Sequence, residues 1–234
     1  MSLGIDPKRV HVLPNGVDPS LFRVGPPDPK CRERWGLGKG PVLGFVGALR
    51  PWHGVRVLPR LLQRLVGRYK DLRLVIVGDG PLRGELEHDL RVAGLLRSSV
   101  FTLSLPHEKI AGLMHHFDVA LAPYPQLDHP FYFSPVKLFE YMACGVPVVA
   151  AAVGQIAEVV RHGETGLLYP PDDTDALVSA CDRLLADQAL RQRLGQAAAK
   201  QVRERYTWDH NAVRVVELAR ALMPMSEEMC PTRC

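Results

Sequence analysis

The chain has 234 residues, of which 47% are hydrophobic and 23% are charged, and its mean hydropathy is close to zero. This is the composition of a folded globular protein, which excludes a disordered, collagen-like or coiled-coil chain. The net charge of +4 is too small to indicate a nucleic-acid partner.

The first 40 residues differ in pattern from the rest of the chain. Residues 10–13, Val-His-Val-Leu, predict a short edge strand, and Asn15-Gly16 is a dipeptide typical of turns. Residues 23–40 are rich in Pro, Gly and Lys and are interpreted as a surface connection. We therefore assign residues 1–40 to a strand and linker segment ahead of the main domain.

Residues 41–223 alternate between hydrophobic runs and amphipathic segments. The runs predict strands at residues 42–46, 72–77, 100–103, 119–121, 146–150 and 166–169. Several are hydrophobic almost throughout, as strands covered on both faces are. The amphipathic segments predict helices at residues 54–67, 81–93, 107–116, 135–143 and 155–161. This alternation predicts an α/β fold with a single doubly wound parallel sheet and helices on both faces.

The chain becomes helical from residue 173 onward. Asp173 is predicted to cap a helix that runs to residue 186, and residues 191–205 and 209–223 predict two more. Trp208, at the start of the last helix, is interpreted as a packing residue. Residues 224–234 lack periodicity and are expected to fray.

Cysteine usage and hydrophobic run lengths indicate a cytoplasmic protein. The five cysteines are odd in number, scattered and without a Cys-x-x-Cys pair, as is typical of reduced thiols: Cys31, Cys144, Cys181, Cys230 and Cys234. No apolar run approaches the ~18 residues of a membrane helix, and the first residues lack a hydrophobic signal segment.

Candidate ligand-binding residues follow the predicted strands, because open α/β sheets bind ligands beyond the carboxyl ends of their strands. Gly47 ends the first main strand and allows a ligand to approach the backbone, and Arg50 and His53 can place positive charge over that ligand. Gly78-Asp79-Gly80 follows the second strand. Position 83 is Arg rather than the third glycine of a dinucleotide fingerprint, which argues against a Rossmann dehydrogenase.

The segment that begins at residue 131 is the most informative. Ser134 is predicted to cap a helix that has Pro135 at its first position and Gly145 as its stop. A helix N-terminus directed at a cleft binds anions. Lys137 in the first turn opposes the helix macrodipole, and a bound phosphate would account for it. Glu140 lies within reach of a hydroxyl-bearing group bound near that terminus.

Other motifs are weaker. The His115-His116 and His107-Glu108 pairs lack a third partner at metal-ligand spacing, so no metal site is predicted. No Gly-x-Ser-x-Gly elbow and no Walker lysine motif occurs in the sequence.

Residues 134–150, Ser-Pro-Val-Lys-Leu-Phe-Glu-Tyr-Met-Ala-Cys-Gly-Val-Pro-Val-Val-Ala, resemble the donor-site signature of the family 4 retaining glycosyltransferases, also called glycosyl transferases group 1. Residues 13–18, 46–54, 77–81 and 163–168 resemble the same family in the same order. Enzymes of this family have the GT-B fold, which consists of two Rossmann-like halves with the active site between them. The chain resembles the carboxy-terminal half, which binds the nucleotide-sugar donor.

The resemblance implies a role for each candidate residue. Glu140 would bind the ribose of the donor, and Gly47 would let the phosphates come close. The remaining groups would hold the diphosphate or flank the base: the amides around Ser134, Val136 and Lys137, the charges of Arg50 and His53, and the loop at Ser104 and Leu105.

The chain departs from the family pattern at four positions. Tyr132 stands where a second acidic residue is usual, and Leu103 where a glycine is common. Ala48 replaces the usual phosphate-binding Arg, and His53 replaces the usual Lys.

The resemblance therefore implies transfer of a sugar from a nucleotide diphosphate sugar to an acceptor, with anomeric retention and without a metal or other cofactor. The acceptor-binding half would precede residues 1–40 and could contact a membrane peripherally, and the isolated chain is expected to bind nucleotide but to transfer little or no sugar. One alternative is a non-catalytic nucleotide-binding subunit that completes a split transferase with a separate N-terminal partner. Another is the related half of a sugar-nucleotide epimerase or a phosphorylase, against which the Ser-Pro-x-Lys sequence argues.

Overall fold

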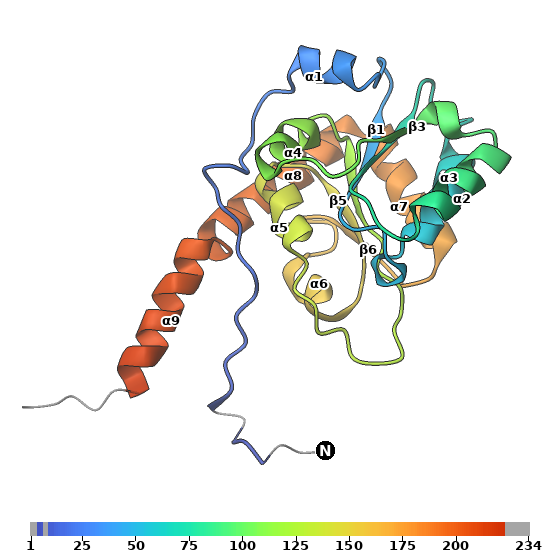
Figure 1. Cartoon of the computed structure of the whole chain (residues 1–234). Coiled ribbons are helices and arrows are strands. Elements are labelled where there is room, and N and C mark those ends of the chain that lie inside the picture. Colours follow the sequence, from blue (N-terminus) through green and yellow to red (C-terminus); the bar gives the residue numbers. More distant parts are fainter. Residues whose placement is uncertain (1–3, 7–8, 223–234) are drawn as a thin grey trace, which may run out of the picture.

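A computed structural model describes residues 4–6 and 9–222 of the chain (Figure 1). Six parallel strands form one sheet in the order β3-β2-β1-β4-β5-β6. The strands are β1 (Val42–Val46), β2 (Arg73–Val77), β3 (Ser99–Phe101), β4 (Val119–Ala122), β5 (Val148–Ala151) and β6 (Leu167–Tyr169). The predicted doubly wound sheet is confirmed. The strand order reverses between β1 and β4, and ligands of such sheets bind at this point.

Helices cover both faces of the sheet, as the alternation predicted (Figure 1). One face carries α2 (Leu58–Leu65), α3 (Arg83–Val92) and α7 (Thr174–Ala186), and the other carries α4 (His107–Met114), α5 (Val136–Ala143) and α8 (Gln188–Arg205). The short α6 (Gly154–Val159) joins β5 to β6, and short 3-10 turns lie at η2 (Pro51–His53), η3 (Val55–Val57) and η4 (Leu96–Ser98).

Burial explains why these segments form these elements. Every residue of β1, β4 and β5 is buried, so these strands lie between two helical layers. Leu58, Leu61, Leu62 and Leu65 recur at helical spacing in α2, and all four are buried. The Asp173 side chain accepts a hydrogen bond from the backbone N–H of Ala176 at 2.8 Å, which confirms the predicted cap of α7.

Two expectations for the N-terminal segment are wrong, and a third gains a helix. Residues 10–13 form no strand, because they lie in an exposed stretch that pairs with neither edge of the sheet. Asn15-Gly16 forms no turn. The backbone there runs along residues 207–208 instead, where a Cβ on Gly16 would lie 2.6 Å from the Trp208 nitrogen. Residues 23–40 form a surface connection, as predicted, and they contain the short helix α1 (Pro29–Arg34), which has no buried residue and is capped by Asp28.

The C-terminal helices begin earlier than predicted. α8 starts at Gln188 rather than at residue 191, because Asp187 caps it through the backbone N–H of Leu190. The last helix is α9 (Trp208–Leu222), which has no buried residue and extends away from the sheet in Figure 1. Trp208 is 47% exposed, so its interpretation as a packing residue is wrong. The predicted frayed tail, with Cys230 and Cys234, lies outside the described residues.

The structure also describes three of the cysteines and the hydrophobicity of the helices. Cys31, Cys144 and Cys181 are free thiols, and burial raises the pKa of Cys144 to about 12. None of the described helices is both long enough and apolar enough to cross a lipid bilayer.

Candidate functional site: an anion-binding cleft at the carboxyl ends of β1 and β4

A cleft of about 620 Å³ opens where β1 and β4 end and α5 begins. Most of the predicted site residues line it, namely Gly47, His53, Ser134, Val136, Lys137 and Glu140. Asn15, Tyr124 and Tyr132 line it as well. The fold therefore brings together residues that are separated by up to about half the chain.

Gly47 ends β1 with a backbone conformation that favours glycine, because its φ is 139°. A Cβ at this position would lie 2.6 Å from the Nζ atom of Lys137. The missing side chain thus leaves space for the lysine ammonium directly against the backbone.

Lys137 is a buried cation without a hydrogen-bonding partner. Its side chain is 8% exposed, and no atom of the described residues accepts a hydrogen bond from its Nζ. Two aromatic rings lie close to it, since Nζ is 4.2 Å from the ring centroid of Phe45 and 5.3 Å from that of Tyr124. Burial lowers the pKa of Lys137 to about 7, and Glu140 opposes part of this shift. An unpaired buried ammonium is costly, and an anion in the cleft would satisfy it.

The start of α5 adds donors to the same cleft. Its N-cap is Pro135, whose side chain caps nothing, so the prediction that Ser134 caps the helix is wrong. The Ser134 hydroxyl instead accepts a hydrogen bond from the backbone N–H of Asn15 at 2.7 Å, and Nδ2 of Asn15 donates to the Ser134 carbonyl at 2.7 Å. The first amides of α5, on Val136 and Lys137, are therefore left without a side-chain cap.

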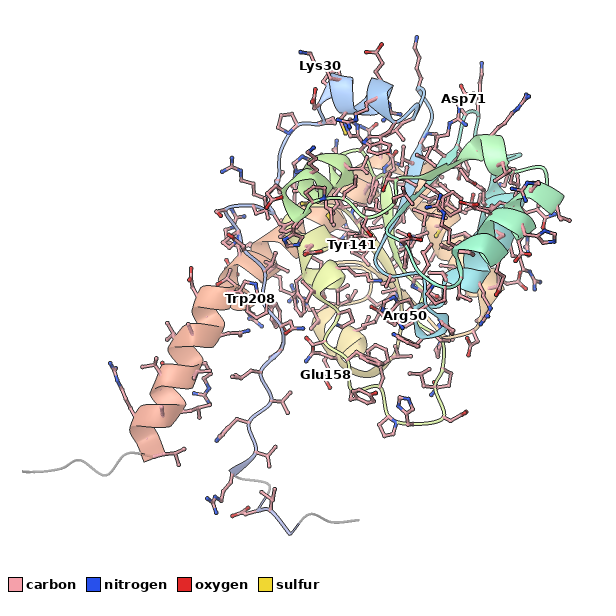
Figure 2. The ribbon with its side chains drawn as sticks, viewed as in Figure 1. Lys30, Arg50, Asp71, Tyr141, Glu158 and Trp208 are labelled. Atoms are coloured by element: carbon pink, nitrogen blue, oxygen red, sulfur yellow. The ribbon has the colours of Figure 1, made fainter. Side chains whose placement is uncertain are left out.

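Two contacts hold α5 in place. The hydroxyl of Tyr141, which is labelled in Figure 2, accepts a hydrogen bond from the backbone N–H of Val46 at 2.6 Å and ties α5 to β1. Gly145 adopts φ 72° directly after the C-cap, which confirms it as the predicted helix stop.

Glu140 is buried one turn into α5, and His107 provides its hydrogen-bonding partner. Nε2 of His107, the first residue of α4, lies 2.7 Å from Oε1 of Glu140. The imidazole packs against Phe22, with 4.8 Å between ring centroids. His107 is a site residue that sequence reasoning missed. The two partners are 33 residues apart on different helices, so no local spacing indicates the pair.

His53 lines the cleft from η2. Its Nδ1 lies 2.5 Å from the Ala48 carbonyl oxygen, which can only accept, so Nδ1 carries a hydrogen. Burial, and then the charge of Lys137, lower the pKa of His53. The neutral ring therefore has Nε2 available to take up a proton when an anion binds.

Three predicted residues do not line the cleft. The Arg50 guanidinium lies over the ring of Trp52, 5.1 Å from its centroid. Ser104 and Leu105 follow β3, away from the cleft lining. Leu103, just before them, has φ 61°, a conformation that a glycine adopts without strain. Within residues 4–6 and 9–222, His, Cys, Asp and Glu side chains form no group of three or more that could hold a metal ion.

Known proteins resemble this chain over most of its length. A GDP-mannose-dependent alpha-(1-6)-phosphatidylinositol monomannoside mannosyltransferase of Mycolicibacterium smegmatis is 34% identical over 212 residues, which are 88% of this chain and 55% of that protein. The structure of HepE of Anabaena in complex with UDP superposes with a TM-score of 0.78 at 24% identity, covering 88% of this chain and 56% of that one. The C-terminal domain of a glycosyl transferase group 1 family protein of Francisella tularensis gives a TM-score of 0.69 at 23% identity, covering 82% of this chain and 99% of that one.

The sheet, its helical layers and these likenesses define a Rossmann-like α/β domain of the kind found in GT-B glycosyltransferases. The glycosyl transferases group 1 family matches residues 40–187, more than half of the chain, and the chain belongs to that family. It spans about half the length of the curated relatives it matches.

Proposed function

We propose that this chain carries the donor site of a retaining glycosyltransferase and that the cleft holds the diphosphate of a nucleotide sugar. The proposal rests on Lys137, whose buried ammonium has no hydrogen-bonding partner among the described residues. It lines the cleft beside the uncapped amides of α5. Its position matches the lysine of the donor-site signature.

The diphosphate binds to positively charged and hydrogen-bond-donating groups, which its negative charge stabilises. Lys137 supplies a cation, the amides of Val136 and Lys137 supply backbone donors at the positive end of α5, and His53 supplies an imidazole that charges when the anion arrives. As the bond between sugar and diphosphate breaks, negative charge grows on the departing oxygen, and preorganised donors stabilise it. These groups provide the positive charge that a metal ion supplies at other phosphate sites, so we propose transfer without a required metal.

Glu140 binds the ribose of the nucleotide. Its carboxylate is buried, and Oε1 is occupied by His107, so Oε2 is left to accept a hydrogen bond from a ribose hydroxyl. The hydrogen bond between the exposed His107 and the buried Glu140 sets the orientation of the carboxylate before the nucleotide arrives.

The transfer itself needs a second half that binds the acceptor. The chain spans about half the length of the relatives that it matches, which supports an active site shared with another domain. We propose that the protein acts in the cytoplasm and that the isolated chain binds nucleotide without turning over sugar. The same length ratio supports the second candidate, a nucleotide-binding subunit of a split transferase. Co-purification of a separate N-terminal partner would favour that candidate.

Titration calorimetry against GDP, UDP and ADP tests the donor site. One of the three nucleotides is expected to bind, and Lys137→Met is expected to weaken it about 10- to 100-fold, because a charge-assisted hydrogen bond is lost. Lys200→Met is the matched control, since Lys200 is an exposed lysine on α8. Absence of binding by all three nucleotides at about 1 mM, or equal affinity of Lys137→Met and the parent chain, would refute the assignment.

A further inference from the structure

A second and larger cavity lies outside the residues assigned to the donor. Its volume is about 880 Å³, against about 620 Å³ for the donor cleft. We call it the aromatic pocket, and it is bounded by η2, by the start of α2, by the loop between β4 and α5, and by the turn before α7. A volume of this size accommodates a drug-sized ligand.

The aromatic pocket and the donor cleft share a wall. Tyr132 and Phe133 line both cavities, and none of the donor residues Gly47, Lys137 or Glu140 lines the aromatic pocket. Tyr132 is 74% exposed, and its ring lies 4.5 Å from that of Phe133 between centroids. A ligand in the aromatic pocket would therefore lie one aromatic layer away from a ligand in the cleft.

The pocket presents aromatic faces that neighbouring groups hold in place. Trp52 lines it, and the Arg50 guanidinium covers one face of the indole at 5.1 Å from the ring centroid. The Tyr132 ring is stacked on that of His129, with 5.3 Å between centroids and 28° between planes. The face of an aromatic ring is electron-rich and attracts the weakly positive C–H groups on the apolar face of a sugar ring.

Charges of both signs surround these rings. Arg56 and Asp173 line the pocket but are engaged elsewhere, Arg56 with Glu85 at 2.5 Å and Asp173 as the cap of α7. Arg60 makes no ion pair or hydrogen bond with the described residues, and Asp172 uses only Oδ2, which accepts from the Gln126 amide at 3.1 Å.

This combination selects against charged ligands. The Asp172 carboxylate would repel an anion, and the Arg60 guanidinium would repel a cation. A neutral polyol instead accepts a hydrogen bond from Arg60 and donates one to Asp172. A purely apolar ligand would leave both charged groups desolvated and unpaired.

We propose that the aromatic pocket binds a neutral sugar unit of the acceptor or of the glycan product, beside the donor. The inference rests on the proposed function, because glycosyl transfer places an acceptor next to the nucleotide sugar, and a carbohydrate acceptor fits the lining of this pocket. The pocket places part of acceptor recognition on the same domain as donor recognition, with Tyr132 and Phe133 between the two ligands.

Saturation-transfer NMR with methyl α-mannopyranoside and maltose tests the proposal on the full chain. Saturation is expected to reach the ring protons of at least one sugar, and the signal is expected to persist when saturating GDP or UDP fills the cleft. Trp52→Ala and Arg60→Ala are each expected to weaken sugar binding about fivefold or more, through loss of a stacking face or a hydrogen bond. Arg64→Ala is the matched control, because Arg64 lies one turn further along α2 and pairs with Asp175 outside the pocket.

Several outcomes would overturn the proposal. Displacement of the sugar by nucleotide would place it in the donor cleft, and equal binding by Trp52→Ala, Arg60→Ala and the parent chain would place it elsewhere. Binding of anilinonaphthalene sulfonate that neither sugar displaces would identify an apolar site. Lys137→Met separates this proposal from the donor assignment, since it should lose nucleotide and keep sugar. If no nucleotide binds the parent chain but sugar binding depends on Trp52, only the donor assignment fails.

Discussion

Lys137 is a charged group that the fold buries before any ligand supplies a counter-charge. The aromatic rings of Phe45 and Tyr124 offset only part of the lost hydration, which is why its pKa falls to about 7. The folded protein therefore carries a local instability at the position where binding needs a cation. Such a free-energy penalty, held in the folded state without a ligand, is typical of functional sites.

The pH dependence of stability follows from that shift. Between the lowered pKa of about 7 and the ordinary value of 10.5, the unfolded chain holds a proton that the folded chain lacks, so stability rises with pH across this window. Below pH 7 the full cost of burying the charge is present. Lys137→Met should therefore be more stable than the parent by roughly 2–5 kcal/mol at pH 6, with the difference narrowing towards pH 10.

Urea unfolding at pH 6, 8 and 10 measures this difference, with Lys200→Met as the variant that should show none. A Lys137→Met protein less stable than the parent at pH 6 would mean that the ammonium has a stabilising partner after all.

His107 is expected to act through Glu140 rather than on the nucleotide directly. Removing it leaves a buried carboxylate without its hydrogen bond, so His107→Ala should weaken ribonucleotide binding about 5- to 30-fold. His107→Gln should recover part of the loss, because an amide also donates. The affinity for a 2′,3′-dideoxynucleotide should change little, since that ligand has no hydroxyl for Glu140.

Calorimetry with both nucleotides measures this discrimination, and Glu108→Ala on the same turn of α4 serves as the control. An equal loss for the two nucleotides would assign His107 a purely structural role.

At the level of elements, local patterns predicted most of the fold. The leucines of α2 were recognisable because burial of one helix face imposes a period on the sequence. Strands β1 and β5 were recognisable because burial on both faces gives a continuous hydrophobic run. Residues 10–13 alternate like a strand, but a strand also needs a partner edge, and sequence alone does not show whether one is available.

The residue types of the candidate donor site were predictable from the sequence, and their contacts were less so. Ser134 precedes a proline, as helix caps often do. Its hydroxyl nevertheless accepts a hydrogen bond from the backbone N–H of Asn15, 119 residues away, and does not cap the helix. Arg50 follows the right strand, but the nearby indole of Trp52 holds its guanidinium outside the cleft lining. Such outcomes depend on which distant groups compete for a side chain, and local spacing does not encode that competition.

The close approach of β1 to α5 makes Gly47 sensitive to any side chain. Alanine there would have to adopt φ 139° and would place its Cβ 2.6 Å from the lysine ammonium. Gly47→Ala should therefore lower the free energy of unfolding by about 1–3 kcal/mol and weaken nucleotide binding.

Gly84→Ala on α3 is the matched control, because its Cβ would meet no atom within 4 Å. Chemical denaturation and calorimetry measure the two effects. If Gly47→Ala and Gly84→Ala had the same stability and nucleotide affinity, the Lys137 ammonium would not lie as close to the Gly47 backbone as described.

At the scale of the whole molecule, the isolated chain should bind nucleotide without turning over nucleotide sugar. In the proposed function the cleft holds only the donor, and this chain covers 55% of the length of a matched relative. Release of nucleotide diphosphate from GDP-mannose and UDP-glucose, in the presence of saccharide acceptors, measures turnover. Nucleotide binding by the same preparation shows that it is folded, and more than one turnover per chain would contradict the expectation.

The pair of hydrogen bonds between Asn15 and Ser134 has a mechanical consequence. The backbone ahead of residue 15 is joined to the residues that open α5 without any intervening element. The Pro14 carbonyl also accepts a hydrogen bond from Nδ2 of Asn211 on α9, so force on that segment is shared between α9 and the start of α5. The orientation of the first amides of α5 is thus coupled to the polypeptide that leads into the domain, as well as to the residues that line the cleft.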